Sequence, residues 1–257
     1  MKVALTGGAS GIGAEVAKKL VAQGHEVTAF DVTRPAEGAA RWIEVNLNDP
    51  ASISAALDAA HGPYDALINN AGLPPREGLE SVILGVNFLG FRSFLTGFLD
   101  KLAPGAAIVN VASRAGAAWR DNIDEVKALM ACAPDEAQAF VEARGIDHVR
   151  AYNLSKEAVI AFTIAETEAM IARGLRMNSV SPAAVSTGIL EDFKSAFGDK
   201  VAKAIGRVGR PGAPSEIADV ILYLASPQSA WIKGQDITID GGMTALAMSD
   251  ALGLKST

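Results

Sequence analysis

Short apolar runs alternate with longer amphipathic stretches along the whole chain, and this alternation limits the folds that are possible. Strands that alternate with helices of this length predict right-handed βαβ units and a parallel sheet covered by helices on both faces. The predicted strands are Val3–Thr6, Glu26–Asp31, Trp42–Leu47, Ala66–Asn69, Ala107–Ala112, Arg176–Ser181 and Ile237–Ile239. The predicted helices are Gly13–Gln23, Pro50–Ala60, Val82–Leu102, Ala151–Arg173 and Pro214–Ala225.

This order of elements predicts an α/β fold, a Rossmann-type doubly wound parallel sheet of about seven strands. No linker rich in Pro, Gly or Ser, no charge block and no repeat divides the chain, so we expect a single domain over residues 1–257. Hydrophobic residues make up 49% of the chain, which is enough for a large core. Ligands of such sheets bind beyond the carboxyl ends of the strands, and the chemistry is expected there.

Charge and cysteine usage exclude several kinds of partner. The formal net charge is −6 and no basic run is present, so nucleic acid and anionic membrane surfaces are poor candidates. Cys132 is the single cysteine, which rules out an internal disulfide and favours a reducing, cytoplasmic compartment. The apolar run Val3–Leu5 is too short for a signal peptide. We expect no membrane-spanning stretch, because Glu166 and Glu168 interrupt the most apolar late segment.

A glycine-rich turn follows the first predicted strand and opens a helix: Thr6-Gly7-Gly8-Ala9-Ser10-Gly11-Ile12-Gly13. Glycines allow a tight turn and let phosphate oxygens approach the backbone N–H groups at the helix N-terminus, where the helix dipole favours negative charge. The next predicted strand ends in Asp31, whose carboxylate can accept both ribose hydroxyls and repels a 2′-phosphate. The pattern predicts a dinucleotide site that prefers NAD, although Arg34 lies near enough to weaken the exclusion of NADP.

A phenol and an ammonium lie four residues apart at Tyr152 and Lys156, on one face of a predicted helix. An unperturbed tyrosine, with a pKa of about 10, is a poor base at neutral pH. We expect the ammonium and a positively charged nicotinamide to lower that pKa, so that Tyr152 exchanges a proton while hydride moves between substrate and cofactor. Ser113, at the end of the fifth predicted strand, is suited to hold the substrate oxygen.

The spacing Gly7-x3-Gly11-x-Gly13 is similar to that of the short-chain dehydrogenase/reductase family, as are Asn69-Asn70-Ala71-Gly72, Pro182 after Asn178, and Asp240-Gly241-Gly242. The chain departs from the family at Asn46 and Ala183, where Asp and Gly are usual. The resemblance implies that NAD is bound by Gly7, Ser10, Gly11, Ile12, Gly13, Asp31, Asn46, Leu47, Asn69, Asn70, Ala71, Gly72, Tyr152, Lys156, Val185 and Thr187.

The resemblance also implies a catalytic set of Asn87, Ser113, Tyr152 and Lys156, in which Asn87 positions a water in a proton relay and Lys156 binds the nicotinamide ribose. The implied reaction interconverts an alcohol and its ketone or aldehyde. The long segment between Ser113 and Tyr152 and the run Gly116-Ala117-Ala118-Trp119-Arg120 resemble, within the family, the branch of coniferyl-alcohol dehydrogenase and 3α-hydroxysteroid dehydrogenase/carbonyl reductase. That branch implies an apolar aromatic or cyclic substrate, and the family implies a homo-oligomer, a dimer or a tetramer.

Two other functions are compatible with the fold. A catalytically idle dinucleotide sensor or scaffold commonly loses the tyrosine or the lysine, whereas this chain keeps both. An epimerase or dehydratase of nucleotide sugars normally needs a larger C-terminal domain than 257 residues provide. No metal site is predicted, because His25, His61 and His148 lack metal-ligand spacing.

Thirty-nine positions separate Ser113 from Tyr152, where the family has roughly a dozen, so residues 114–150 form an insertion. Ile123, Val126, Leu129 and Met130 recur at helical spacing, and a second helix is expected to start at Pro134-Asp135-Glu136. Since both ends of the insertion adjoin catalytic residues, we expect it at the mouth of the active site. Its apolar residues, Trp119 among them, either wall a substrate pocket or only pack the insertion onto the domain.

Overall fold

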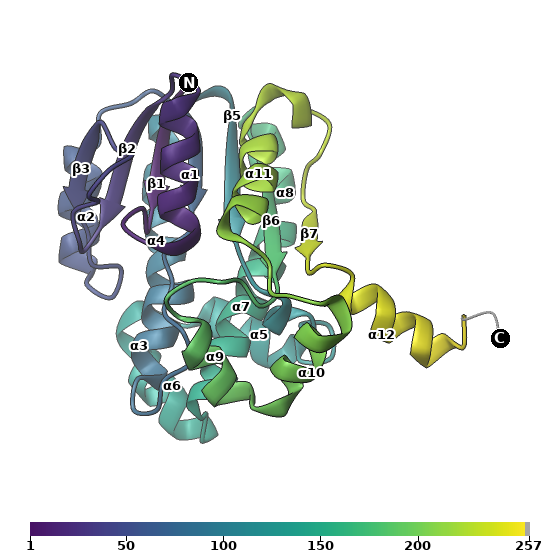
Figure 1. Cartoon of the computed structure of the whole chain (residues 1–257). Helices are drawn as coiled ribbons and strands as arrows, with labels where there is room; N and C mark the ends of the chain where they lie inside the picture. Colours follow the sequence, from purple (N-terminus) through teal and green to yellow (C-terminus); the bar gives the residue numbers. More distant parts are fainter. Residues whose placement is uncertain (255–257) are drawn as a thin grey trace.

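The computed structural model describes residues 1–254, so the last three residues of the expected domain lie outside the described part. Seven parallel strands form one sheet in the order β3-β2-β1-β4-β5-β6-β7 (Figure 1). The predicted doubly wound fold is confirmed. The strands are β1 (Lys2–Thr6), β2 (Glu26–Asp31), β3 (Arg41–Glu44), β4 (Tyr64–Asn69), β5 (Leu102–Val111), β6 (Arg176–Pro182) and β7 (Asp236–Ile239).

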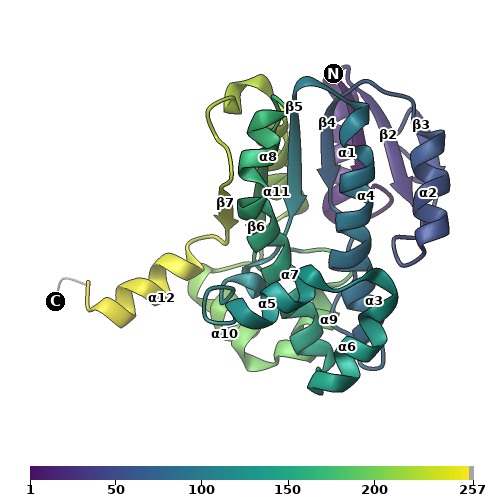
Figure 2. The same ribbon diagram turned by 180° about the vertical axis from the view of Figure 1, so that it is seen from behind.

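Helices cover both faces of the sheet because its central strands are apolar on both sides. Helices α1 (Gly11–Ala22) and α11 (Pro214–Ala225) cover one face. The opposite face, seen in Figure 2, carries α2 (Pro50–Ala59), α4 (Phe91–Phe98), α7 (His148–Ala165) and α8 (Thr167–Ala172). At the carboxyl ends of the strands lie α3 (Glu80–Leu84), α5 (Ile123–Ala131), α6 (Ala137–Arg144), α9 (Leu190–Phe197) and α10 (Asp199–Val208).

Two predicted boundaries were wrong for local reasons. Strand β3 ends at Glu44, before the predicted Leu47, since the Asn46 side chain accepts a hydrogen bond from Asn48 N (2.9 Å) and closes a turn there. The predicted helix Ala151–Arg173 is two helices, α7 and α8, and α7 begins earlier because Asp147 accepts a hydrogen bond from the Arg150 N–H (2.7 Å).

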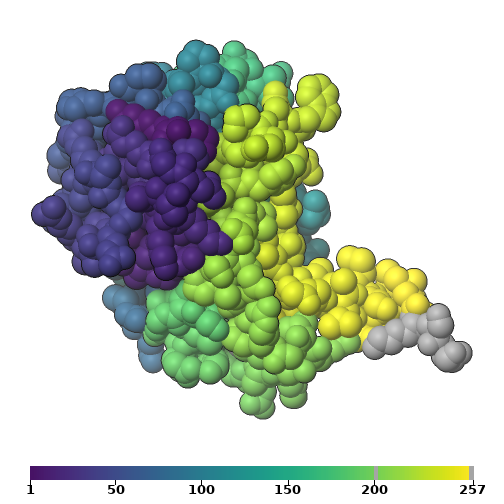
Figure 3. Space-filling view, turned by 45° about the horizontal axis from the view of Figure 1, so that its top comes forward, coloured from purple at the N-terminus to yellow at the C-terminus, as the bar shows by residue number. Residues whose placement is uncertain are grey.

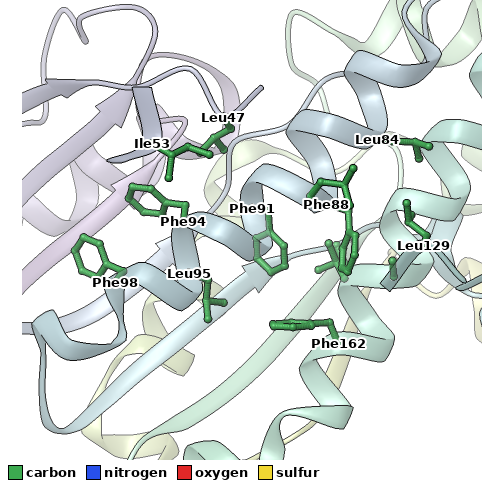
Figure 4. Packing of buried hydrophobic residues seen from close by; sticks show 14 of the residues in the cluster. Leu47, Ile53, Leu84, Phe88, Phe91, Phe94, Leu95, Phe98, Leu129 and Phe162 are labelled. Carbon is green, nitrogen blue, oxygen red and sulfur yellow. The ribbon is translucent and has the colours of Figure 1, made fainter. Parts of the chain in front are cut away.

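The predicted helix Val82–Leu102 is one apolar rod whose helical type changes three times. It runs from α3 through a π-helical turn, Gly85–Gly90, into α4 and a final 3₁₀ turn. A side chain at Gly85 would meet the Asn48 amide, and one at Gly90 would meet the Leu47 carbonyl. These glycines therefore serve close packing and let Phe88, Phe91, Phe94 and Phe98 enter the core (Figure 4).

The same rod corrects one expectation. By length and composition alone, Glu80–Lys101 could cross a membrane, whereas the sequence was expected to hold no such stretch. In the structure, 67% of its apolar window is buried inside the fold. Phe94 meets Phe30 of β2 edge to face, with ring centroids 5.2 Å apart, so this rod is a core helix of the α/β fold.

The insertion contains the two predicted helices, α5 and α6, with the 3₁₀ turn Pro134–Glu136 before α6. Its apolar side chains Val126, Leu129, Phe140 and Val141 are buried in the same cluster as α4 and α7. They pack the insertion onto the domain, whereas Trp119 is only partly buried at the edge of that cluster. For the two helices, the structure thus favours the alternative that their apolar residues pack the insertion onto the domain.

Arg150 of α7 makes an ion pair with the buried Glu157 of the same helix and a second one with Glu125 of α5, which joins the two helices. The Arg150 guanidinium donates to both carboxylate oxygens of Glu157, at 2.9 and 2.7 Å, and also to Glu125 of α5. Asn122 Nδ2 donates to the same Glu157 oxygen at 2.8 Å. Since Glu157 is only 1% exposed, its charge depends on these donors.

The sequence reading missed three helices beyond β6: α9, α10 and α12 (Met243–Leu252). Helix α12 projects away from the body of the molecule, as the ribbon and the space-filling view both show (Figures 1 and 3). Met248 and Leu252 on it are exposed.

Removing the Glu157 carboxylate leaves Arg150 in a largely buried position with Glu125 as its remaining ion-pair partner. We expect Glu157→Ala to lower the free energy of unfolding by about 2 kcal/mol in a urea titration. Glu191→Ala is the matched control, because the Glu191–Lys194 pair lies at the surface, and it should change stability by less than about 0.5 kcal/mol. Equal losses in the two variants would contradict the buried-pair interpretation.

Candidate functional site

The predicted site residues come together at one end of the sheet. Strands β1 and β4 are neighbours, although β1 also pairs with β2, so the chain changes direction between them. Loops from the two halves separate at such a point and leave a crevice for a ligand. Asp31, Asn69 and Ser113 all lie at or directly after the carboxyl ends of their strands.

The glycine turn after β1 is built against the segment that follows β4. Gly7 has a φ of +70°, and a Cβ on it would lie 2.6 Å from Ala71 Cα. Asn70 Nδ2 donates to the Gly7 carbonyl at 2.8 Å, and Thr6 Oγ1 accepts the N–H groups of Asn70 and Ala71 at 3.1 Å. The predicted motif from Asn69 to Gly72 thus supports the turn.

The N-terminus of α1 offers donors to an anion. Ser10 is its N-cap residue, but the serine side chain makes no capping hydrogen bond. The first-turn N–H groups of Gly11, Ile12 and Gly13 lack intrahelical acceptors by the geometry of a helix. Thr187 approaches this turn, since a Cβ on Gly11 would lie 3.5 Å from Thr187 Cγ2. These donors fit the pyrophosphate of a dinucleotide.

Asp31 lies beside the same turn. Its two carboxylate oxygens accept the N–H groups of Ala9 (2.9 Å) and Thr33 (3.0 Å). The carboxylate is thereby fixed next to the glycine turn, where a ribose would lie if a pyrophosphate occupied the α1 N-terminus. No hydrogen bond or ion pair between Arg34 and Asp31 occurs within the described residues.

Other predicted cofactor residues have a structural role in this arrangement. The Leu47 side chain is buried in the core beside Ile53 and Phe94 (Figure 4), so only its main chain can border an adenine. Asn69 Nδ2 donates to Asn110 Oδ1 at 2.9 Å inside the sheet. Val185 forms a β-bridge with Gly212, which holds the loop after β6 near the site.

Tyr152 and Lys156 lie on α7 and are each 5% exposed. Lys156 Nζ donates to the carbonyl of Val111, the last residue of β5, at 2.9 Å. Ser113 follows that strand end, and its hydroxyl lies near enough to the Tyr152 phenol to lower the pKa of the phenol. The structure therefore brings together Ser113, Tyr152 and Lys156 as the sequence predicted.

Burial shifts the pKa values of Tyr152 and Lys156 in opposite directions. Burial raises the pKa of Tyr152 to about 12, and the hydrogen bond with Ser113 lowers it only in part. Burial also lowers the pKa of Lys156 to about 8. The lowering expected from the ammonium and a positively charged nicotinamide together stays a prediction; by itself, Lys156 Nζ lies 6.0 Å from the Tyr152 ring centroid and donates to Val111.

Asn87 lies in the π-helical turn, a deviation that often marks functional sites. Its Oδ1 accepts the Leu73 N–H at 2.7 Å, and its Nδ2 donates to the Leu73 carbonyl (3.0 Å) and to Ser155 Oγ (3.3 Å). A Cβ on Gly72 would lie 3.3 Å from both Asn87 Oδ1 and Lys156 Nζ. Asn87 thus lies near the lysine and holds the loop after β4 against α7.

The sequence reading missed two contacts of the site. Phe193 of α9 meets the Tyr152 ring edge to face at 5.2 Å, and Phe197 stacks on Phe193. Arg76 donates to both carboxylate oxygens of Asp192 at 3.0 Å, which ties α9 to the loop after β4. The amphipathic pattern of residues 190–197 was the signal that could have located this helix.

Two cavities lie away from this centre. One of about 540 Å³ is lined by Gly105 and Arg176 at the opposite end of the sheet, and one of about 450 Å³ lies between α4 and α7. Neither cavity is lined by Tyr152 or Ser113, so the candidate site is defined by the reactive side chains Ser113, Tyr152 and Lys156. Within residues 1–254, no group of three His, Cys, Asp or Glu side chains could hold a metal ion.

Comparisons with known proteins agree with this geometry. A family model described as short chain dehydrogenase matches residues 1–123, and one described as enoyl-(acyl carrier protein) reductase matches residues 137–244. Residues 124–136, which include most of helix α5, lie between the two matches.

Curated relatives match over nearly the whole chain. Coniferyl-alcohol dehydrogenase of Pseudomonas sp. (strain HR199) is 31% identical over 95% of this chain and 96% of its own length. The 3-alpha-hydroxysteroid dehydrogenase/carbonyl reductase of Comamonas testosteroni is also 31% identical, with the same coverage. The crystal structure of a 3-alpha-hydroxysteroid dehydrogenase from Pseudomonas sp. B-0831 complexed with NADH has a TM-score of 0.86 and 30% identity, covering 97% of this chain and 99% of that one.

The fold and the strand-end site define an α/β protein of the dinucleotide-binding type. The chain belongs to the short-chain dehydrogenase/reductase family, as the family model and the relatives show. The resemblance stated from the motifs is confirmed, including its similarity to the coniferyl-alcohol and 3α-hydroxysteroid enzymes.

The lowered pKa of Lys156 predicts a pH dependence of stability. Above pH 8 the folded protein releases the proton of the buried ammonium, while the unfolded chain keeps it up to about pH 10.5, so wild-type stability rises with pH in that window. Relative to Lys156→Met, the wild type should gain about 2 kcal/mol in free energy of unfolding between pH 7.5 and 9.5, measured with urea. Tyr152 is present in both proteins, so its titration cancels to first order. A constant difference across this range would show that the amine is not held in a desolvated site.

Proposed function

We propose that the protein is an NAD-dependent oxidoreductase that interconverts an alcohol and its ketone or aldehyde. One observation carries this proposal: Ser113, Tyr152 and Lys156 gather where β5 ends, at the same edge of the sheet as the glycine turn and Asp31. A hydroxyl, a phenol and an amine gathered in this way can hold a substrate oxygen and move its proton. The family membership and the names of the relatives support the same reaction class.

The dinucleotide would be held along the crevice between the two halves of the sheet. The α1 N-terminus, with Ser10, Gly11 and Ile12, would bind the pyrophosphate, and Asp31 would bind the adenosine ribose. On the adenine side, Asn46 and Leu47 would offer backbone groups, while Val185 and Thr187 would border the nicotinamide. When bound, the nicotinamide supplies the hydride acceptor or donor.

The chain's own residues would handle the proton. Ser113 holds the substrate oxygen near the Tyr152 phenol, and the phenol takes the hydroxyl proton during oxidation or returns it during reduction. Burial makes the phenolate unfavourable in the protein by itself, with a Tyr152 pKa of about 12. A positive charge brought beside the phenol favours its ionised form, so catalysis would be coupled to cofactor binding. Lys156 would bind the nicotinamide ribose, and Asn87 would position a water that links the lysine to solvent.

The surroundings of Tyr152 support an apolar aromatic or cyclic substrate. Phe193 meets the Tyr152 ring edge to face, Phe197 stacks on Phe193, and Trp119 of the insertion is partly buried. Aromatic rings prefer such edge and stacked contacts with other rings. The named substrates of the similar relatives, coniferyl alcohol and 3-alpha-hydroxysteroids, are of this kind. We also propose a cytoplasmic location and a homo-oligomer, which the single buried cysteine and the exposed apolar residues of α12 favour.

Asp31 predicts the choice of cofactor. A 2′-phosphate would meet a fixed carboxylate at close range, so kcat/KM should be at least about tenfold higher with NAD(H) than with NADP(H), or roughly 1.4 kcal/mol of discrimination. In Asp31→Ala, the ratio of the two kcat/KM values should fall by a larger factor than turnover with NADPH does. Steady-state kinetics with both cofactors measure the ratio, and equal efficiencies in the wild type would contradict it.

Tyr152→Phe tests the proposed reaction, because it removes only the phenolic oxygen. We expect the affinity for NADH, measured by fluorescence titration, to change little, while turnover falls by at least about a hundredfold. The assay follows NADH formation with a panel of aromatic, steroid and cyclic alcohols, with small aliphatic alcohols for comparison. A wild type that binds NADH but oxidises none of them would favour an idle sensor, and full turnover in Tyr152→Phe would remove Tyr152 from its role.

A further inference from the structure

We propose that Arg114 is a positioning residue, which fixes the hydroxyl of Ser113 by tying the strand end of β5 to the C-terminal segment after β7. This inference rests on the proposed function, since it concerns how the same site is held. Three observations carry it: the geometry of the short turn that begins at Arg114, the contact of that turn with α7, and the partners of the Arg114 side chain.

Ser113 is the N-cap of a 3₁₀ turn, Arg114–Gly116. Its Oγ accepts the Ala115 N–H at 3.2 Å, and its carbonyl accepts the Gly116 N–H at 2.9 Å. On the other side, the Ala112 N–H donates to the Val180 carbonyl of β6 at 2.8 Å. The orientation of the Ser113 hydroxyl therefore follows the position of this turn.

The turn rests directly on the catalytic helix. A Cβ on Gly116 would lie 2.7 Å from Lys156 C and 2.8 Å from Glu157 N, so the backbones of the turn and of α7 are in close contact. Backbone atoms on both sides leave little room for adjustment. This contact limits how near the turn can come to α7, but it does not stop the turn from moving away from α7.

The Arg114 side chain supplies that second restraint. Its Nε donates to Thr244 Oγ1 at 3.1 Å and lies 3.6 Å from Asp240 Oδ2. Asp240 is 8% exposed, and its oxygens accept the N–H groups of Gly242 (2.9 Å) and Thr244 (2.7 Å). Burial alone would raise the pKa of Asp240, but these hydrogen bonds and the charge of Arg114 together lower it, so the carboxylate stays ionised at neutral pH.

The consequence is a link between distant parts of the chain. Asp240 directly follows β7, and Thr244 lies in the first turn of α12, the helix that projects from the body (Figure 1). Arg114 directly follows Ser113, and its side chain joins the base of α12 to the end of β5. A change at the base of α12 would thus reach the hydroxyl that hydrogen-bonds with Tyr152.

The first test needs neither substrate nor cofactor. The chain has three tyrosines, so ¹³Cζ-labelled tyrosine gives three NMR signals, and Tyr152→Phe assigns the one that matters. Ser113→Ala gives the shift of a phenol without its serine partner. At fixed pH, Arg114→Ala should move the Tyr152 signal toward that reference. Arg173→Ala is the control, because Arg173 is an ion-paired arginine of similar exposure at the other end of the sheet, and it should leave the signal unchanged.

The second test uses turnover. Because Arg114 is 40% exposed, we expect Arg114→Ala to lower kcat by a moderate factor, roughly fivefold, with NADH affinity unchanged. Loss of the Ser113 hydrogen bond should also move the pH limb of alcohol oxidation upward, since that bond lowers the pKa of Tyr152. Thr244→Val should act in the same direction, Arg114→Ala/Thr244→Val should be no worse than Arg114→Ala, and Arg114→Lys should recover part of the loss.

The two tests separate this proposal from the proposed function. If Arg114→Ala lowers the melting temperature but leaves the Tyr152 signal and the pH limb at their wild-type positions, the arginine is only structural and the inference is overturned. If the signal moves but the wild type oxidises no alcohol, the positioning holds and the assigned reaction is wrong.

Discussion

The hydrogen bond from the Lys156 ammonium to the Val111 carbonyl is the contact on which the site depends. A buried amine needs an acceptor, and the last carbonyl of β5 is the acceptor that α7 finds. Ser113 follows Val111 by two residues, and Tyr152 precedes Lys156 by about one helical turn. One bond between a helix and a strand end therefore sets the distance between the phenol and the serine.

A second contact supports α7 one layer deeper. Asn110 of β5 accepts from Asn69 of β4 and donates to Thr163 of α7, at 2.9 Å each. These side chains are buried, and each makes the bonds that an apolar interior requires of it. The helix is thus held to the sheet at Lys156 and again at Thr163. A helix fixed at two levels cannot slide or rotate freely, so the proposed proton exchange at Tyr152 would take place at a fixed position.

The insertion and the helices after β6 add to this fixed frame in different ways. Helix α5 joins α7 through the Arg150–Glu125 ion pair and buried aliphatic side chains, so it is part of the core. Helix α9 has no buried residue, and it meets the site through Phe193 and the Arg76–Asp192 pair. The first arrangement resists motion, whereas the second consists of contacts that a substrate can replace at small cost.

Much of the fold and of the catalytic centre could be predicted from the sequence, because the signals are local. The alternation of strands and helices needs only hydrophobic periodicity, and the pairing of Tyr152 with Lys156 needs only the pitch of a helix. The same holds for the glycine turn and for Asp31 at a strand end. Helices α9 and α10 were missed although their sequences are amphipathic at helical spacing, whereas α12 has no distinct apolar face to predict it.

What only the tertiary structure decided depends on segments far apart in the chain. Burial sets the direction of the Tyr152 pKa, and the sequence shows the nearby lysine but not the apolar surroundings. The rod from Glu80 to Lys101 is long and apolar enough to cross a membrane, and its burial against the sheet identifies it as a core helix. The Phe193 ring on Tyr152 and the link from Arg114 to Asp240 join residues that follow different strands. Such contacts follow from how the strand ends converge, and local patterns do not encode them.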